Sequence, residues 1–471
     1  MSEQIPVRNI TPPPAKGGES VDLYASREKI YTRAFTGLFR NLRLGGGAFL
    51  FLLYFGTVWL SWNDRQAVWW NLPERKFFIF GATFWPQDFA LLSWLLIICA
   101  FGLFFITVFA GRVWCGYTCP QSVWTWIFMW CEKVTEGDRN QRMKLDKAPM
   151  SANKLLRKAA KHSLWLLIGL VTGLTFVGYF SPIRDLLPSL LSGTADGWAY
   201  FWVGFFTLAT YGNAGWLREQ VCKYMCPYAR FQSAMFDRDT LIVTYDAARG
   251  EPRNPRQTAP GAGDCIDCSM CVQVCPTGID IRKGLQYECI GCAACVDACN
   301  GVMDKVKRPR GLIRYATENA LVQRFTPAQV RQRVLRPRVL VYTAVLAILG
   351  TAMVTSLALR NPLKLDVIRD RGSMGREVED GMIENVYRLQ LMNTVEDAQR
   401  LRIAVSGIKS ARVVEGEVVD IDPASTRAIP VRVRVNPGEA MPGSNRIAFH
   451  VTSSDGHGLR VEEAAVFLVP K

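Results

Sequence analysis

Histidine is nearly absent from this sequence, which narrows the chemistry that the chain can support. Only three histidines occur among 471 residues: His162, His450 and His457. None lies in a pattern typical of a zinc or haem site, so we expect no haem. A phosphate-binding P-loop, a glycine-rich dinucleotide fingerprint and a nucleophile elbow are also missing. The metal-binding capacity of the chain therefore depends on cysteine.

Cysteine is absent after residue 299, but fourteen cysteines precede that point. Eight of them form two runs with the spacing C-x2-C-x2-C-x3-C. These are Cys265, Cys268, Cys271 and Cys275, then Cys289, Cys292, Cys295 and Cys299. The doubled spacing is typical of bacterial ferredoxins that hold two [4Fe-4S] clusters. Structural zinc prefers two C-x2-C pairs, and a disulfide framework suits a small secreted domain, so both alternatives fit poorly.

The fourth cysteine of each run is expected to bind the cluster of the other run, as in two-cluster ferredoxins. One predicted ligand set is Cys265, Cys268, Cys271 and Cys299. The other is Cys289, Cys292, Cys295 and Cys275. Two such clusters predict a one-electron carrier, without indicating which molecules it serves.

Long apolar stretches are common in the sequence. Five are long enough to cross ~30 Å of hydrocarbon as helices. They are residues 44–62, 89–110, 163–180, 198–216 and 339–359. The fourth contains Thr207, Thr210 and Asn213 and would also suit a buried helix of a soluble protein. The polar first 43 residues contain no cleaved signal peptide, so we expect the first span to remain as an anchor.

Lysine and arginine alternate between rich and poor segments. Residues 1–43, 111–162 and 217–338 carry seven, ten and nineteen, whereas residues 63–88 and 181–197 carry three and one. By the positive-inside rule, the rich segments face the cytoplasm of a bacterial inner membrane, and the C-terminal part faces the periplasm. The net charge of +15 then reflects topology and attraction to anionic lipid. No motif supports nucleic-acid binding.

A six-residue motif, C-x-Y-x-C-P, occurs twice outside the ferredoxin runs. Its cysteines are Cys115 and Cys119 in the first copy, and Cys222 and Cys226 in the second. Each copy follows the predicted cytoplasmic end of a span, so spans one–two and three–four resemble repeats of one helical hairpin. Proline favours the first position of a helix, which makes Cys119 and Cys226 cap residues. Paired thiolates suit Cu(I), zinc, a further cluster or a redox-active dithiol, although cysteines near a membrane also pack as small apolar residues.

The pattern of the sequence changes after residue 360. Alternating runs cover residues 386–392, 400–405, 431–435, 447–452 and 461–469, with turn residues between them. Short strands at this spacing favour an antiparallel Ig-like sandwich. We find no catalytic constellation there, so either partner binding or a purely stabilising role is open.

These features predict a multi-domain membrane protein. Residues 1–43 form a cytoplasmic tail, and residues 44–216 form four transmembrane helices as two hairpins. Residues 217–338 form a cytoplasmic loop with an α+β ferredoxin-like domain for two [4Fe-4S] clusters, at about 255–305. A fifth transmembrane helix at 339–359 completes a five-helix α-helical bundle, and an all-β Ig-like sandwich at 360–471 lies in the periplasm.

In combination, the cysteine runs, paired motifs, five spans and sandwich resemble the FixG/RdxA family, also called CcoG, from about Tyr24 to the end. These are accessory proteins for the assembly of cbb3-type cytochrome c oxidase. The resemblance implies reduction of Cu(II) to Cu(I) on the cytoplasmic side, with copper as substrate and with oxidase assembly factors and copper-handling proteins as partners. It matches the eight cysteines of the runs to cluster ligands, and Cys115, Cys119, Cys222 and Cys226 to the membrane-proximal motifs.

Two alternatives remain open at the level of sequence. The clusters and C-x3-C-P pairs are also similar to the quinol-dehydrogenase ferredoxin proteins of periplasmic nitrate reductase systems, which would imply a quinol-oxidising electron conduit. A non-catalytic scaffold for oxidase assembly is the other alternative. The electron donor is not indicated, although the basic residues of 305–338 would suit an acidic soluble carrier as well as a lipid surface.

Overall fold

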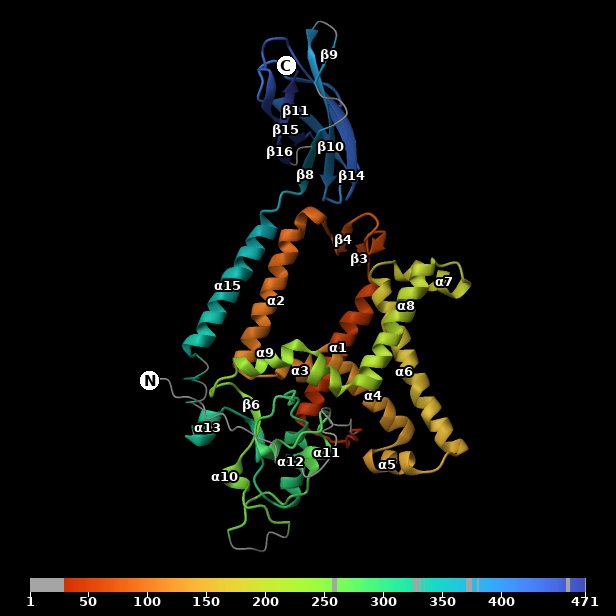
Figure 1. Ribbon diagram of the computed structural model, residues 1–471, viewed down its shortest axis with the longest axis vertical. Coiled ribbons are helices and arrows are strands. Elements are labelled where there is room, and N and C mark those ends of the chain that lie inside the picture. Colours follow the sequence, from red (N-terminus) through yellow and green to blue (C-terminus); the bar gives the residue numbers. More distant parts are fainter. Residues whose placement is uncertain are drawn as a thin grey trace, which may run out of the picture.

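The computed structural model describes residues 29–255, 261–323, 325, 329, 332, 333, 335–369, 375–378, 381–454 and 458–470. Most of the predicted N-terminal tail, together with His457, lies outside the described residues. Figure 1 shows an elongated molecule with a β-sandwich at one end and the cysteine-rich region at the other. Long helices lie between these two parts.

Four helices among the described residues are long and apolar enough to cross a membrane. They are Leu38–Trp59, Pro86–Ala110, Ala152–Gly178 and Pro337–Ala358. These contain α1 (Leu38–Gly56), α2 (Phe89–Ala110), α6 (Ala152–Gly178) and α15 (Pro337–Ala358). They overlap four of the five predicted spans, which identifies a membrane protein.

The remaining predicted span, 198–216, is not one continuous α-helix. It falls on α8 (Gly197–Thr210), which continues as the π-helix η3 (Tyr211–Leu217). The hydroxyl of Thr210 donates to the backbone carbonyl of Phe206 at 2.8 Å where the helix type changes. A π-helical segment interrupts the regular α-helix, so α8 alone is shorter than the other candidates. A five-span topology therefore stays a prediction.

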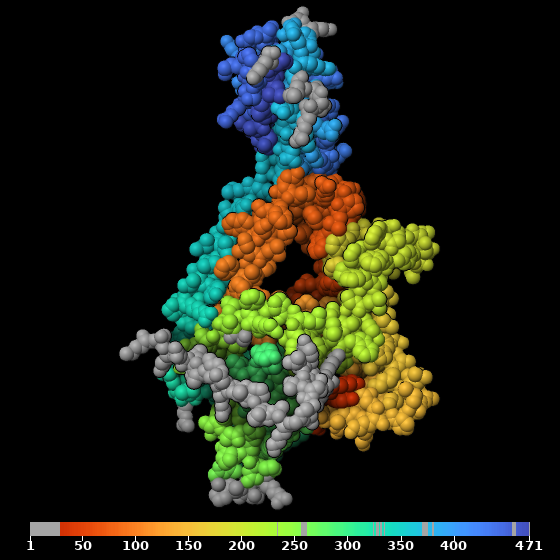
Figure 2. All heavy atoms as spheres, in the orientation of Figure 1, coloured from red at the N-terminus to blue at the C-terminus, as the bar shows by residue number. Residues whose placement is uncertain are grey.

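The long helices fall into two groups. Helix α15 packs along α2, whereas α8 packs along α6, which also contacts α1. Glycine makes the second contact close, because a Cβ at Gly169 or Gly173 would lie 2.9 or 2.8 Å from a backbone oxygen of α8. Figure 2 shows an opening between the orange α2 and the yellow-green α8. A single bundle of five helices thus also stays a prediction.

Shorter helices cover one end of the long ones. After α2 the chain forms α3 (Val113–Tyr117), α4 (Pro120–Glu136) and α5 (Arg139–Lys147). After α8 and η3 it forms the π-helix η4 (Val221–Met225) and α9 (Pro227–Met235). The helix α7 (Ile183–Ser192) lies at the opposite end, between α6 and α8 (Figure 1).

The cysteine-rich region is built on a small antiparallel pair of strands. Strand β6 (Ile242–Tyr245) pairs with β7 (Ile313–Ala316), and the cysteine runs lie between them in sequence. The intervening helices are α10 (Ala247–Gly250), α11 (Met270–Gln273), the 3-10 helix η5 (Ile281–Lys283) and α12 (Ala294–Lys305), and α13 (Glu318–Val322) follows β7. The predicted α+β ferredoxin-like character of this region is confirmed.

The C-terminal part is a sandwich of two antiparallel sheets, as predicted. One sheet has the order β12-β14-β10-β8, with β9 paired to β10, and the other has the order β13-β11-β15-β16. The strands are β8 (Leu363–Arg369), β9 (Arg376–Glu377), β10 (Ile383–Asn393), β11 (Gln399–Ser406), β12 (Arg412–Glu415), β13 (Val418–Ile421), β14 (Thr426–Val435), β15 (Gly443–Ser453) and β16 (Arg460–Val469). Alternate residues of both sheets fill one apolar core around Tyr387 and Phe449.

The loop between α1 and α2 forms a docking surface for the sandwich. It contains the 3-10 helices η1 (Thr57–Trp59) and η2 (Pro86–Asp88) and the strands β1 (Ser61–Trp62), β2 (Arg65–Gln66), β3 (Val68–Asn71), β4 (Lys76–Ile79) and β5 (Ala82–Phe84). Glu396 of the sandwich accepts hydrogen bonds from Trp62, Asn63 and Arg65 of this loop, the last two at 2.7 and 2.6 Å. Buried Asp88 pairs with Arg360 at 2.6 Å and with Lys364.

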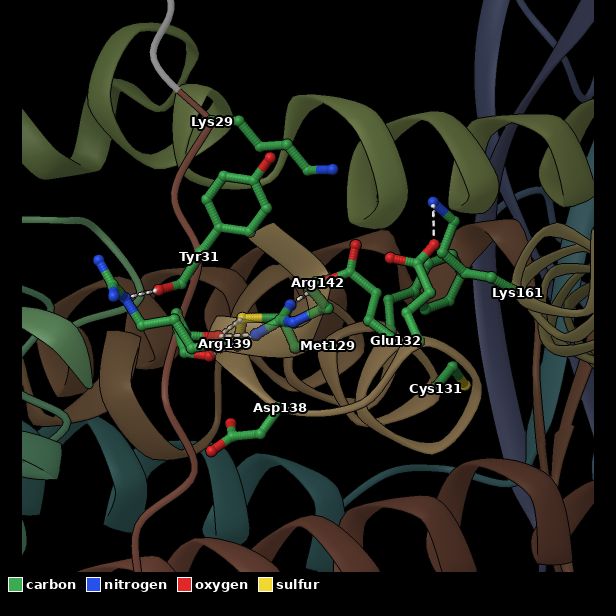
Figure 3. Close-up of polar contacts among 12 residues, drawn as sticks. Lys29, Tyr31, Met129, Cys131, Glu132, Asp138, Arg139, Arg142 and Lys161 are labelled. Carbon is green, nitrogen blue, oxygen red and sulfur yellow. Dashed lines mark hydrogen bonds and ion pairs between the residues drawn. The ribbon is translucent and has the colours of Figure 1, made fainter. Parts of the chain in front are cut away.

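At the other end, the N-terminal strap, residues 29–36, crosses α4 and α5 (Figure 3). Arg139 donates to the Tyr31 carbonyl at 3.1 Å, and Arg142 donates to the Thr32 carbonyl and to buried Glu132. The strap also reaches the cysteine-rich region, because the Arg33 N–H donates to the Gln273 carbonyl at 2.8 Å. It therefore links the membrane-proximal helices to the region of the cysteine runs.

Candidate iron-sulfur and thiol site

The eight cysteines of the runs line two small cavities, one for each predicted ligand set. One cavity is lined by Cys265, Cys268, Cys271 and Cys299. We call these four the outer set. The second cavity is lined by Cys275, Cys289, Cys292 and Cys295, and Cys271 also lines it. We call these four the inner set. Each cavity thus contains the fourth cysteine of the opposite run.

The backbone repeats its conformation in the two loops that hold these cysteines. Asp267 and Ser269 have φ values of 50° and 54°, and Gly291 and Ala293, at the equivalent places of the second run, have 65° and 56°. Left-handed conformations are costly for residues other than glycine, so their repetition marks a specific loop shape. In both loops a helix begins directly afterwards, α11 after Ser269 and α12 after Ala293.

The donor chemistry and the surroundings fit iron-sulfur clusters. Both cavities are lined mainly by sulfur and aliphatic side chains such as Ile281 and Met303. Burial raises the pKa of the Cys289 and Cys299 thiols to about 12, so free thiolates are disfavoured there unless a cation such as iron compensates their charge. Which sulfur binds which cluster stays a prediction.

The two C-x-Y-x-C-P motifs come together below α2 and α8. Cys115 lies in α3 and Cys222 in η4, while Cys119 and Cys226 are the cap residues of α4 and α9, each followed by proline. We call these four the four-thiol site. Burial raises the pKa of Cys115, and that of Cys222 to about 12, and charges on the neighbouring cysteines of the site add to both effects. The four sulfurs are therefore close enough to interact.

Within the described residues, no group of three or more His, Cys, Asp and Glu side chains is arranged tightly enough to hold one metal ion. A two-coordinate Cu(I) ion needs only a pair of soft thiolates, and a cubane cluster spreads its ligands over four corners. The role of the four-thiol site stays a prediction.

The four-thiol site rests directly on the inner set. A Cβ at Gly116, the residue after Cys115, would lie 2.9 Å from both the Cys292 Cα and the Ile290 carbonyl oxygen. Cys115, Ile290 and Cys292 belong to one buried apolar cluster with Val274. The absence of a side chain at Gly116 is what allows the two backbones to touch.

The two motif copies differ in their surroundings. Tyr117 of the first copy lies 3.4 Å from the Tyr315 hydroxyl, which donates to the Gly291 carbonyl at 2.5 Å within the inner loop. Its counterpart Tyr224 is 64% exposed, and Met225 beside it is 60% exposed. The tyrosine of the first copy is thus bonded into the cluster-bearing region, whereas that of the second copy is exposed to solvent.

Three further residues of the site have no clear sequence signal. Arg112 donates to the Tyr287 carbonyl and its backbone packs on Gly291. Gln232, fully buried, accepts from the Cys115 thiol at 3.7 Å and donates to Tyr228 at 2.8 Å. Tyr315 comes from β7, far along the chain.

Comparison with known protein families identifies two parts of the chain. Residues 217–318 match the family model of the 4Fe-4S dicluster domain. Residues 353–470 match the model described as the IG-like fold at the C-terminus of FixG. The nitrogen fixation protein FixG of Rhizobium meliloti is 39% identical over 425 residues, 83% of this chain and 81% of the relative. The chain belongs to the FixG/RdxA family.

Other relatives share all or part of this architecture. Protein RdxB of Cereibacter sphaeroides is 41% identical over 400 residues, covering 82% of this chain and 84% of the relative. The methylamine utilization ferredoxin-type protein MauN of Paracoccus denitrificans is 25% identical over 197 residues, 41% of this chain and 56% of that protein. This FixG/RdxA protein is accordingly a membrane-associated iron-sulfur electron-transfer protein.

Proposed function

We propose that this protein reduces Cu(II) to Cu(I) at the four-thiol site and so supports copper delivery during assembly of a cbb3-type oxidase. The single observation that carries the proposal is the contact between Gly116 of the first motif and the Cys292 backbone of the inner set. It brings a cluster of soft thiols against a region built for one-electron carriers. Thiolates stabilise the softer Cu(I) ion over Cu(II).

The two [4Fe-4S] clusters that the outer and inner sets would hold supply one-electron reducing equivalents when bound. The overall change is then one electron from a reduced soluble one-electron carrier to one Cu(II), which gives Cu(I) and the oxidised carrier. Of the four thiols, Cys115 is buried and fixed by Gln232 and Arg112, and the other three are half-buried. Burial keeps water from competing with sulfur for the ion.

The proposal also fixes an orientation. We place the cysteine-rich region and the N-terminal strap in the cytoplasm, and the sandwich in the periplasm of a bacterial inner membrane. The separation of these parts to opposite ends of the long helices supports this topology, as does the excess of Lys and Arg in segments 111–162 and 217–338. A fifth span formed by α8 and η3 is part of the same proposal.

The experiment follows Cu(I) directly. Anaerobically purified protein in detergent is reduced, freed of excess reductant and mixed with Cu(II), and a chelator that absorbs only with Cu(I) reports the product. We expect wild-type protein to form Cu(I) in proportion to its bound iron. Replacement of Cys115 and Cys222 by Ser should abolish rapid formation of Cu(I) while the iron content is retained. Cys292→Ser should lower the iron content. An unchanged Cu(I) yield in this iron-depleted variant would contradict the proposal.

A matched pair of glycine variants isolates the contact itself. Gly116→Ala inserts a methyl group against the Cys292 backbone, whereas Gly102→Ala in α2 meets no atom within 4 Å. We expect Gly116→Ala to slow Cu(I) formation several-fold at unchanged thiol count, and Gly102→Ala to behave like wild type. Titration with a reduced soluble ferredoxin and with a quinol, each followed by cluster bleaching, tests the donor class.

A further inference from the structure

The charges around the two cysteine sets are strongly unequal. We propose that Arg112 and Arg43 raise the reduction potential of the cluster at the inner set above that of the cluster at the outer set, so that an added electron resides beside the four-thiol site. The inference rests on the clusters assigned under the proposed function and adds a direction to it. It concerns two arginines that would not bind iron or copper themselves.

Arg112 is a buried cation in direct contact with the inner loop. It is 6% exposed, and its guanidinium donates to the carbonyl of Tyr287, two residues before Cys289. A Cβ at Gly291, between Cys289 and Cys292, would lie 3.1 Å from the Arg112 backbone. Its Nε atom is buried without a hydrogen-bond partner. Within the described part of the chain, Arg112 forms no ion pair with a carboxylate.

Arg43 approaches the same set from α1. It is 8% exposed, lies over the ring of Trp126 at 5.7 Å, and lines one cavity with Val274 and Pro276, the two neighbours of Cys275. Among the described residues Arg43, too, has no carboxylate partner.

The outer set has arginines as well, but carboxylates neutralise them. Arg282, which lines the cavity of the outer set, pairs with Asp280 at 2.7 Å and with Asp267. Arg253 pairs with Glu251 at 2.7 Å and lies 3.9 Å from Asp267. Asp264, next to Cys265, pairs with Arg249 at 2.5 Å and with Arg308 at 3.4 Å. The arginines near the outer set are therefore paired with carboxylates, whereas the inner set has two buried arginines without such partners among the described residues.

Asp297 does not cancel this difference. It lies on α12 between Cys295 of the inner set and Cys299 of the outer set, and among the described residues it forms no ion pair with Arg43 or Arg112. Its carboxylate is also bound to the backbone N–H groups at the start of α1.

Physical chemistry gives the sign. Reduction adds a negative charge to a cluster, and a nearby cation lowers the free energy of that reduced state. The effect is greatest where protein rather than water separates the charges. Cys268 of the outer set is exposed, so water reaches one corner there and screens charge, whereas both inner arginines act through buried surroundings. The inner site is therefore favoured for the electron.

The test is a potentiometric titration of the full-length, anaerobically purified protein, without copper, followed by electron paramagnetic resonance. We expect two separated midpoint potentials. Arg112→Gln and Arg43→Gln, which remove charge but keep an N–H donor, should each lower the higher midpoint and leave the lower one unchanged. Arg112→Lys should preserve it. Arg282→Gln is the matched control and should lower only the lower midpoint.

The outcomes decide the matter either way. If Arg112→Gln and Arg43→Gln leave the higher midpoint in place, or move only the lower one, the proposal is wrong. Iron and sulfide analysis accompanies each variant, and if Arg112→Gln loses iron, Arg43→Gln and Arg112→Lys still decide. Because copper is absent, failure of Cu(II) reduction would leave this result untouched, and a shifted midpoint would stand without it.

Discussion

The carboxylate of Asp297 accepts hydrogen bonds from the backbone N–H groups of Phe39 and Arg40, at 3.3 and 2.8 Å. Asp297 lies between two cluster cysteines on α12, and the two N–H groups open α1, a candidate membrane span. One side chain of the cysteine-rich region thus caps a helix of the membrane part. The first turn of α1 and the inner cysteine set are consequently held in fixed register.

Removing the charge of this cap should loosen the junction. We expect Asp297→Asn to destabilise the protein by about 1 kcal/mol, because a carboxylate at a helix start interacts favourably with the exposed N–H groups. Thermal unfolding in detergent, with iron retained, measures the effect. Asp304→Asn serves as control, since Asp304 pairs with Arg310 at an exposed place on the same helix.

A steric variant approaches the same junction from the other side. A Cβ at Gly37 would lie 2.2 Å from the Asp297 carboxyl carbon. Gly37→Ala should therefore lower the unfolding midpoint at least as far as Asp297→Asn does. Equal stability of Gly37→Ala and wild type would show that the contact is not maintained in solution.

The crossed assignment of cluster ligands predicts which substitutions behave alike. Cys299 belongs to the second run but lines the cavity of Cys265, Cys268 and Cys271. We expect Cys299→Ser and Cys265→Ser to lose the same paramagnetic signal, and Cys275→Ser and Cys289→Ser to lose the other. Spin quantification on reduced protein checks this. Pairing of Cys299→Ser with Cys289→Ser instead would refute the crossed arrangement.

Glu132 should make the stability of the membrane-proximal helices depend on pH. Burial raises its pKa, but the guanidinium groups of Arg218 and Arg142 lower it further, so the net pKa lies below the ordinary value. A depressed pKa contributes stability above the unfolded pKa of about 4.3, and this contribution is lost as pH falls. At pH 7 we expect Glu132→Gln to cost about 3–5 kcal/mol, because two arginines lose their buried partner.

The measurement compares unfolding midpoints of wild type and Glu132→Gln from pH 7 down to pH 3. Their difference should hold down to about pH 4.3 and shrink below it, where the unfolded chain takes up the proton first. A difference that stays constant down to pH 3 would mean that Glu132 does not carry the charge assigned to it. Arg157→Gln on the exposed face of α6 provides a variant with one cation fewer and no buried partner.

Glu396 should help to hold the sandwich against the loop between α1 and α2. Glu396→Ala removes an acceptor shared by Trp62, Asn63 and Arg65. We expect trypsin to release the sandwich faster by cleavage after Arg360, since the linker opens more often when one of its two anchors is lost. Glu439→Ala, at an exposed turn of the sandwich, should leave the rate unchanged. Equal rates of tryptic release for both variants would show that Glu396 does not hold the sandwich in place.

Much of this architecture is readable in the sequence, for identifiable physical reasons. Cysteine spacing is local, so the loops around Cys265 and Cys289 follow from it, and Pro120 and Pro227 mark helix starts directly. The strands 431–435 and 447–452 reveal themselves by alternation. Strand β8 was not predicted, although Asn361 and Pro362 give a turn signal directly before it and Leu363, Leu365 and Val367 alternate with polar residues.

Other features depend on contacts between distant segments. Nothing local distinguishes Arg112 or Arg43 from the many basic residues that set topology, since their role comes from burial beside another part of the chain. The π-helical turns at η3 and η4 likewise depend on packing and capping that no periodicity reports. Thr210 and Asn213 hinted at a departure from a plain span without giving its form.

The unequal setting of Tyr117 and Tyr224 has a consequence for access. Tyr224 and Met225 present their side chains to solvent, whereas Cys115 is buried and packs against the loop of Cys292. The two copies of the motif therefore differ in exposure to solvent. Substitutions at the exposed copy should alter which molecules reach the four-thiol site, whereas substitutions at the packed copy should destabilise the protein.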